Sequence, residues 1–319
     1  MEFHIYHPQL RTPSTVVEEA PKLEALGYDG LVMPDHLFVL DFQVGTPLPY
    51  PHPLAILAAA AAVTTRVRLL SLVSNNLARG PVELAHQTAT LANLAPGRTE
   101  LAIGTGWFAA EHLAAGVGFP TGGERIEMLL ETVHICRQLF ERATVDHEGK
   151  HYRVSIPEGG FPPVTSRIPI MVGAAGPRMI REAARVADRV DLQPDAIAGG
   201  GADLQRYNAY TFDLLAAGAA RAQEAARAAN RTVSVSASPF VYAAADEADA
   251  DQMRRQMAGF VDLPLEALEQ SFGTIIGTPD QIADKLRRYP DAGCDRVHLQ
   301  ALNVEAATRL APMLRTLRS

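Results

Sequence analysis

The feature that most constrains this chain is the alternation of short apolar runs with longer segments of helical periodicity. Residues 30–33, 67–73 and 99–103 are nearly continuous apolar runs. Strands buried on both faces have this pattern, which is typical of parallel sheets covered by helices. Further strands are predicted at residues 3–7, 168–172, 190–192, 233–241 and 296–299. Eight such strands close into a barrel, so the sequence predicts an α/β fold, a (β/α)8 barrel forming one domain over residues 1–319.

Two insertions, after the fourth and seventh strands, exceed what a bare barrel needs. Residues 108–165 contain a predicted helix at 124–140 and a hairpin at 145–154. Residues 243–277 are polar and are predicted to form a mobile lid, and a long alanine-rich helix is predicted over 203–230. The insertions are either inert additions or, as loops on the active face of a barrel more often are, walls of a substrate pocket.

Composition excludes several classes of partner. The 29 basic and 36 acidic residues give a formal net charge of −7, which does not favour nucleic acid or an anionic membrane. The longest weakly polar run, residues 51–63, is too short to span a bilayer. Cys136 and Cys294 sit in apolar surroundings and are expected to be reduced. The start of the chain lacks the features of a signal peptide, so we expect a cytoplasmic protein.

The strand at residues 101–103 runs into Gly104-Thr105-Gly106-Trp107, which includes the single tryptophan. Small residues at the end of a strand let the backbone approach a ligand closely, although a tight turn gives the same pattern. In parallel α/β folds, ligands bind at the carboxyl ends of the strands. Polar or small residues follow three consecutive strands: Asp35 and His36; Ser74 and Asn75; Gly104, Gly106 and Trp107, with Glu111 one helical turn further on.

His36 is the candidate acid–base residue, because histidine can transfer a proton near neutral pH. The alternative is a structural histidine held by a neighbouring carboxylate such as Asp35. Glu111 is a weaker catalytic candidate. Trp107 is expected either to form a flat apolar wall or simply to be buried in the core. The remaining histidines lack the paired spacing of metal ligands, so we predict no metal.

The loop at residues 173–176, Gly-Ala-Ala-Gly, follows the fifth strand and leads into a predicted helix. Backbone N–H groups and the helix dipole make such a position favourable for a phosphate. Pro177 suits the first helical position, and Arg178 adds positive charge. A plain turn without a ligand is the alternative.

Together these stretches form a recognisable set of motifs. They are Gly27-Tyr28-Asp29 through Pro34-Asp35-His36; Arg66-Val67-Arg68-Leu69 through Asn75-Asn76; Leu94 through Trp107 with Glu111; Phe161-Pro162-Pro163; and Ala174-Ala175-Gly176-Pro177-Arg178. With them, residues 27–192 and 275–299 resemble the bacterial luciferase-like superfamily, and within it the group that uses the deazaflavin coenzyme F-420. Flavin users of the superfamily share these motifs, so FMN is the alternative cofactor.

The resemblance implies a barrel with the deazaflavin ring across the strand ends, His36 near the reactive centre of the ring, and the cofactor phosphate on loop 173–176. In several relatives the third strand ends in a non-proline cis peptide bond, which here corresponds to Leu72–Val73. Relatives often form dimers, so a homodimer is one possible state. The implied cofactor-binding residues are Asp35, His36, Leu72, Val73, Ser74, Asn75, Gly104, Gly106, Trp107, Gly173, Ala174, Ala175, Gly176 and Arg178.

The chain departs from the sugar-phosphate dehydrogenases that it resembles. Those enzymes carry a glutamate where Trp107 stands, a tryptophan near Leu40, and lysines that hold a phosphorylated substrate. The chain has few lysines, so we expect a different substrate. The group's Arg-His-Pro motif appears as Arg79-Gly80-Pro81, which keeps the arginine and lacks the histidine.

Three functions follow as hypotheses. The first is a deazaflavin-dependent oxidoreductase that transfers a hydride to or from a small, largely apolar organic substrate, with His36 at the reactive centre and Glu111 as the weaker candidate. The second is an FMN-dependent luciferase-like monooxygenase. The third is a barrel that binds a cofactor without turnover.

Overall fold

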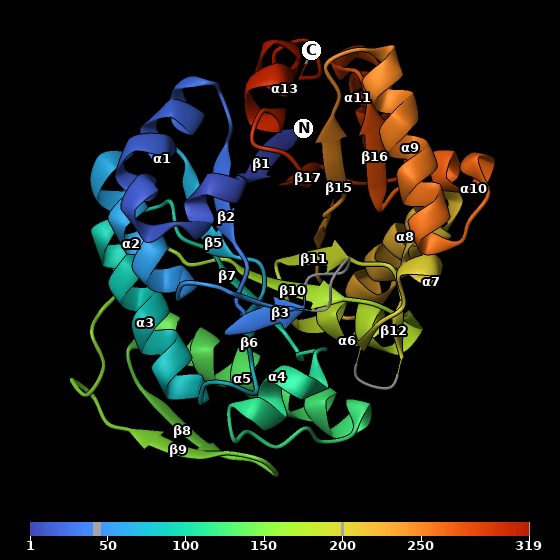
Figure 1. Cartoon of the computed structure of the whole chain (residues 1–319). Helices are drawn as coiled ribbons and strands as arrows, with labels where there is room; N and C mark the ends of the chain where they lie inside the picture. The colour runs from blue at the N-terminus through green and yellow to red at the C-terminus, as the bar shows by residue number, and fades with distance from the viewer. Residues whose placement is uncertain (41–45, 199–200, 319) are drawn as a thin grey trace.

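The predicted barrel is present in the computed structural model of the chain, which describes residues 1–40, 46–198 and 201–318 (Figure 1). Neighbouring strands run parallel in the order β5-β2-β1-β17-β14-β11-β10-β7-β6. The ring of strands closes because its two end members, β5 and β6, belong to the same segment of the chain. In addition, Leu69 of β5 forms a parallel β-bridge with Thr99, just before β7. The strands are β1 (Glu2–Tyr6), β2 (Gly30–Met33), β5 (Arg68–Ser71), β6 (Ser74–Asn75), β7 (Leu101–Gly104), β10 (Ile170–Ala174), β11 (Arg189–Leu192), β14 (Ser234–Ala237) and β17 (Arg296–Ala301).

Successive residues of these strands face two different apolar layers. Leu31 and Leu69 belong to the large core between strands and helices. Val32 and Leu70 instead join a small cluster that includes Ala102 of β7, on the other face of the strands. Because both faces are buried, the sequence needs continuous apolar runs rather than an alternating pattern.

Helices surround the barrel on its outside, so that each strand is followed by a segment that returns the chain to the amino end of the next strand (Figure 1). The larger helices are α1 (Val16–Ala25), α2 (Pro53–Val63), α3 (Pro81–Leu94), α5 (Gly122–Arg142), α6 (Pro177–Val186), α8 (Phe212–Ala228), α11 (Pro279–Leu286) and α13 (Ala306–Leu314). Short pieces are η1 (Pro8–Arg11), η2 (Pro13–Thr15) and α12 (Arg288–Asp291).

The first insertion follows the prediction closely. It contains α4 (Ala109–Ala114), then α5, then a hairpin of β8 (Val145–Glu148) and β9 (Arg153–Ile156). Glu131 of α5 fixes the hairpin, because its carboxylate accepts the backbone N–H groups of residues 150–152 at 3.0–3.1 Å. The hairpin thus packs on α5, while α4 stays at the strand ends.

The second insertion differs from the predicted lid. It forms α9 (Glu247–Val261) and α10 (Leu265–Gln270), followed by β16 (Thr274–Gly277), which pairs parallel with β15 (Phe240–Ala243). The acidic run that suggested a solvated loop begins α9, where the Asp246 side chain caps the helix. Four apolar side chains of these helices are buried: Ala250, Ala258, Val261 and Leu268.

Two elements predicted as continuous are each broken in two. The segment 203–230 forms α7 (Leu204–Asn208) and α8, because Thr211 between them pairs as a β-bridge with Ser271. The segment 233–241 forms β14, in the barrel, and β15, which pairs with β16 and β17. The break falls at Pro239, which has no N–H group to donate.

Smaller hairpins complete the structure. They are β3 (Phe38–Leu40) with β4 (Pro47–Pro49), and β12 (Ile197–Ala198) with β13 (Gly201–Ala202). Within the described ranges, the helices lack the combination of length and apolar character that crossing a bilayer requires.

Candidate active site

A buried carboxylate holds the candidate acid–base residue at the end of β2. Nδ1 of His36 lies 2.9 Å from Oε2 of Glu111, which α4 carries 75 residues further along the chain. Oε1 of the same carboxylate accepts the backbone N–H groups of Leu37 and Phe38. The Glu111 side chain is 6% exposed and that of His36 17%. Tertiary folding therefore joins the two predicted catalytic candidates directly.

This arrangement determines which imidazole nitrogen carries the proton. An ionised carboxylate can only accept hydrogen bonds, so Nδ1 of His36 must be the donor to Glu111. Nε2 then carries a lone pair in the neutral ring, and it has no hydrogen-bond partner among the described residues. Nε2 of His36 is therefore the ring atom that can accept a proton, and the Glu111 carboxylate orients the ring.

Two aromatic rings lie near His36. The ring centroid of Trp107 lies 5.5 Å from that of His36, and the ring of Tyr50 lies 6.2 Å away, both edge-on. Trp107 stacks on Phe108 at 5.3 Å, and Phe108 meets Phe38 at 5.9 Å. Trp107 is partly exposed rather than buried. The expectation of an aromatic wall at this position therefore describes Trp107 better than simple core burial does.

Asp35, next to His36 in sequence, has a different role. Both of its oxygens bind the guanidinium of Arg79, and one also accepts the backbone N–H of Asn75 at 2.8 Å. Arg79 also donates to Nε2 of His52 at 3.0 Å. Burial and then the charge of Arg79 lower the pKa of His52. Asp35 thus fixes the start of β6 and does not hold His36.

Asn75 has its side chain committed to the protein. Its Nδ2 donates to Nε2 of His112 at 2.9 Å, and Nδ1 of His112 donates to the carbonyl of Phe108 at 2.7 Å. Oδ1 of Asn75 accepts the backbone N–H of Leu77. Gly106 has φ = 74°, and a Cβ there would lie 2.9 Å from Nε2 of His112. Asn75 and Gly106 therefore position α4 and the aromatic wall.

The third strand ends as the resemblance implies, with a cis peptide bond at Leu72–Val73. The hydroxyl of Tyr6 donates to the Leu72 carbonyl. The Val73 side chain lies between two neighbouring strands: a Cβ on Gly104 would be 2.5 Å from Val73 Cγ2, and a Cβ on Gly173 would be 3.1 Å from Cγ1. These two glycines make room for Val73, which gives a packing reason for glycine at position 104; close approach of a ligand at Gly104 stays a prediction.

The loop after β10 has the features predicted for an anion site. Gly176, at φ = 75°, precedes α6 and offers no capping side chain, so N–H groups of the first turn lack an intrahelical or capping acceptor. Arg178 is exposed, and its Nη1 lies 3.3 Å from where a Cβ of Gly123 would stand. Asp195 is an unexpected neighbour of this loop, because its Oδ2 lies 3.3 Å from where a Cβ of Gly176 would stand. Arg206 balances the charge of Asp195 at a distance of 3.2 Å.

The remaining expected residues lie close by. Ser74 is buried at the start of β6, Ala174 is buried at the end of β10, and Ala175 is partly exposed beyond it. Because β2, β6, β7 and β10 run parallel, their carboxyl ends lie at one end of the barrel. His36 and the loop at 173–176 therefore face the same end.

Sequence reasoning missed Tyr50, His52 and His112. Tyr50 and His52 follow β4, and no periodicity in the sequence indicates that this hairpin returns to β2. His112 lies next to Glu111 in the sequence, and its spacing from other histidines predicts no metal site. The only sequence indication of a role for Arg79 is that the arginine is kept in the motif Arg79-Gly80-Pro81, in which the histidine of the group is absent.

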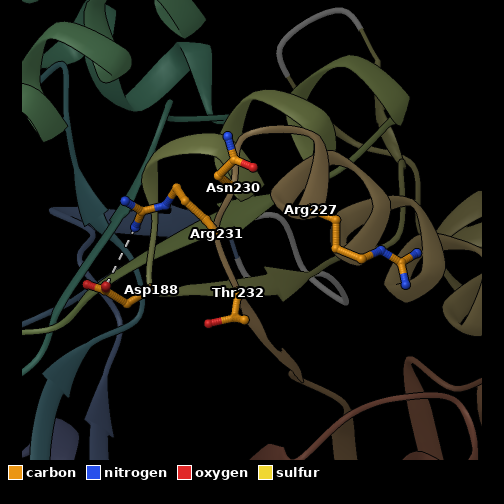
Figure 2. A pocket seen from close by; sticks show the side chains of 5 residues that line it. All are labelled: Asp188, Arg227, Asn230, Arg231 and Thr232. Atoms are coloured by element: carbon orange, nitrogen blue, oxygen red, sulfur yellow. Dashed lines mark ion pairs between the residues drawn. The ribbon is translucent and has the colours of Figure 1, made fainter.

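A surface hollow lies away from this site. It has a volume of about 580 Å³ and is lined by Asp188, Arg227, Asn230, Arg231 and Thr232 (Figure 2). Asp188 precedes β11 and Thr232 precedes β14, so the hollow is at the amino end of the barrel, opposite His36. The carboxylate of Asp188 accepts a hydrogen bond from the backbone N–H of Ile170 at 2.8 Å and lies 3.8 Å from the guanidinium of Arg231. This hollow is therefore separate from the candidate site.

Comparison with known proteins gives a consistent result. Residues 1–296 match the luciferase-like monooxygenase family. An F420-dependent glucose-6-phosphate dehydrogenase from Nocardia farcinica is 27% identical over 337 residues, covering 96% of this chain and 95% of the relative. An F420-dependent secondary alcohol dehydrogenase, solved with an F420–acetone adduct, superposes with a TM-score of 0.81 at 16% identity, over 100% and 99% of the two chains. The monooxygenase RslO1 from Streptomyces bottropensis superposes at 0.73 with 23% identity, over 100% and 97%.

The fold and the comparisons define a barrel oxidoreductase. The chain belongs to the luciferase-like monooxygenase family. The predicted barrel, the family resemblance and the prediction of an F-420-dependent oxidoreductase are confirmed.

Proposed function

We propose that His36 serves as the proton acceptor and donor in hydride transfer between coenzyme F-420 and a small organic substrate. The observation that carries this role is the hydrogen bond from Nδ1 of His36 to Glu111, which leaves Nε2 free at the strand ends. When a carbinol is oxidised, Nε2 accepts the hydroxyl proton; in the reverse direction it returns the proton to the carbonyl oxygen.

The residues around β6 and α6 fit a planar ring with an anionic tail. Val73 fills the space between Gly104 and Gly173, so these three residues would support the ring. The uncapped first turn of α6 and the exposed Arg178 would hold the phosphate. Coenzyme F-420, when bound, supplies the acceptor or donor of the hydride.

The other residues of the site would position and shield. Glu111 keeps His36 in one tautomer, and the Asp35–Arg79 pair fixes the start of β6 through the Asn75 N–H group. Trp107 and Tyr50 cover two sides of the imidazole and would exclude water from the proton-transfer step.

A binding assay and a set of variants test this proposal. Tight F-420 binding, followed through the cofactor's fluorescence, is expected, with weaker binding of FMN. His36→Asn should retain F-420 binding and lose about 10²–10⁴-fold in kcat, the usual contribution of an acid–base group. His134→Asn is the matched control, because His134 is exposed on the outer helix α5.

Two outcomes would contradict the proposal. Tight binding of FMN without binding of F-420 would favour the oxygen-activating alternative, which the monooxygenase among the structural neighbours supports. Cofactor binding without turnover of any substrate, in both wild type and His36→Asn, would favour a barrel that only binds.

Oligomeric state and location are part of the proposal as well. We propose a cytoplasmic location, because both cysteines, Cys136 and Cys294, are buried and unpaired, as is usual in a reducing compartment. We also propose a homodimer, the state that the family resemblance implies. Sedimentation of the purified protein tests the dimer, and a monomer over a wide concentration range would exclude it.

A further inference from the structure

We infer that the substrate is an uncharged alcohol, or the corresponding ketone, with an aromatic or similarly apolar substituent, and not a phosphorylated sugar. This inference rests on the proposed function and adds the substrate class. It is carried by two independent observations: the occupation of the positive charges at the strand ends, and the aromatic surroundings of His36.

A phosphate monoester carries up to two negative charges and is normally held by more than one arginine or lysine. In the described part of the chain, six arginines lie in the loops and first helical turns that follow the barrel strands. They are Arg11, Arg79, Arg125, Arg178, Arg206 and Arg309. The question is which of them has a free guanidinium.

Most of these arginines are already engaged. Arg79 gives two of its nitrogens to Asp35. Arg125 donates to the carbonyl of Gly106 and lies 4.1 Å from the ring of Phe119. Arg206 pairs with Asp195, and Arg309 donates to the carbonyl of Ala243 at 2.5 Å. Arg178 belongs to the proposed cofactor phosphate site.

Arg11, Arg125 and Arg309 keep their positive charge, because none of them pairs with a carboxylate among the described residues; Arg125 and Arg309 donate only to backbone carbonyls. The guanidinium of Arg11 covers the ring of Tyr50 at 5.0 Å. The three lysines of the chain are engaged away from the strand ends: Lys22 with Glu19 on α1, Lys150 with Glu127 beside the hairpin, and Lys285 on α11 near the carbonyl of Thr274. To gain charged partners, a sugar phosphate would therefore have to draw these arginines away from the carbonyl and ring contacts that hold them.

The surroundings of His36 favour an apolar substituent instead. Trp107 and Tyr50 flank the imidazole, and Trp107 continues into Phe108 and Phe38. Contact with such a surface stabilises a bound apolar group by about 25 cal/mol for each Å² removed from water. A sugar would gain little from this surface, because its hydroxyl groups would find few polar partners there besides the Tyr50 hydroxyl and the Trp107 N–H.

The reaction balances with the groups named. The C–H bond of the carbinol breaks and its hydride passes to the deazaflavin, while the O–H proton passes to Nε2 of His36. A C=O bond forms, so the alcohol is oxidised by two electrons and coenzyme F-420 is reduced by two.

The single tryptophan gives a direct binding assay, because Trp107 lies beside His36 and no other tryptophan contributes. Acetophenone should produce a saturable change in tryptophan fluorescence of the wild-type chain, and glucose 6-phosphate should produce none. The F-420-loaded enzyme should oxidise 1-phenylethanol and not glucose 6-phosphate.

A variant pair separates the aromatic wall from general effects. Trp107→Leu should raise the KM for 1-phenylethanol about tenfold, since roughly half of the apolar contact is lost. Phe260→Leu, which replaces an exposed aromatic side chain on α9, should leave it unchanged.

Two results would overturn the inference. One is glucose 6-phosphate turnover with a kcat/KM equal to or above that of the aryl alcohol. The other is F-420 binding without turnover of 1-phenylethanol or reduction of acetophenone. Failure to bind F-420 at all would instead refute the proposed function, so the two failures are distinguishable.

Discussion

Gly104→Ala is a substitution whose effect can be worked out from the structure. The new Cβ would stand 2.5 Å from Cγ2 of Val73, whereas carbon atoms in contact prefer about 3.5–4.0 Å. Val73 is branched at Cβ and also lies against Gly173, where an added Cβ would stand 3.1 Å from Val73 Cγ1, so the side chain cannot rotate away freely. Either the strand end or Val73 must shift by about 1 Å.

Such overpacking typically costs about 1–3 kcal/mol, which for a chain of this size lowers the melting temperature by about 5 °C. Calorimetry of Gly104→Ala should show this loss, and fluorescence titration should show weaker F-420 binding. Gly118→Ala is the control, because a Cβ at that position meets nothing within 4 Å. The double variant with Val73→Ala should regain most of the lost stability. A neutral Gly104→Ala, or a double variant with purely additive losses, would refute the packing argument.

Glu111→Gln should lower kcat/KM about 10–100-fold and leave the F-420 affinity unchanged. The NH2 group of the glutamine must point either at Nδ1 of His36 or at the N–H groups of Leu37 and Phe38, so a donor faces a donor in one of the two places. An unchanged kcat/KM in steady-state assays would contradict this. Arg79→Met should lower the free energy of unfolding by about 3–5 kcal/mol in urea denaturation, because it leaves Asp35 buried and unpaired, and added Asp35→Asn should recover part of that loss. Burial and then the charge of Arg296 lower the pKa of His4 from 6.5 to about 3. As the pH drops, the imidazole of His4 is therefore protonated in the unfolded chain before it is protonated in the folded chain, so the free energy of unfolding should fall between pH 6.5 and 3 by up to about 1.4 kcal/mol per pH unit. Urea titrations should show a smaller dependence on pH for His4→Leu; an equal dependence would exclude His4 as the cause.

The barrel was predictable because its strands are buried on both faces, which leaves a strong apolar signal in the sequence. The breaks within 203–230 and 233–241 were not, because pairing with distant segments decides them. Thr211 leaves the helix to bridge Ser271, and the strand residues beyond Pro239 pair with β16 and β17. Local periodicity carries no information about such partners.

The site was partly predictable for the same reason. Residues that directly follow strands, such as His36 and Trp107, could be placed at one end of the barrel from sequence order alone. The specific partners could not, since His36 meets Glu111 across 75 residues and Asp35 meets Arg79 across 44. The anion site at residues 173–176 has the predicted geometry and stays a prediction.

The hydrogen bonds of Glu111 have a consequence for motion at the site. One oxygen orients the imidazole, and the other holds the two amides that lead into the hairpin of β3 and β4. The hairpin cannot lift from the barrel without releasing those amides and loosening the carboxylate. Docking of this flap and readiness for proton transfer are thus mechanically coupled through a single side chain.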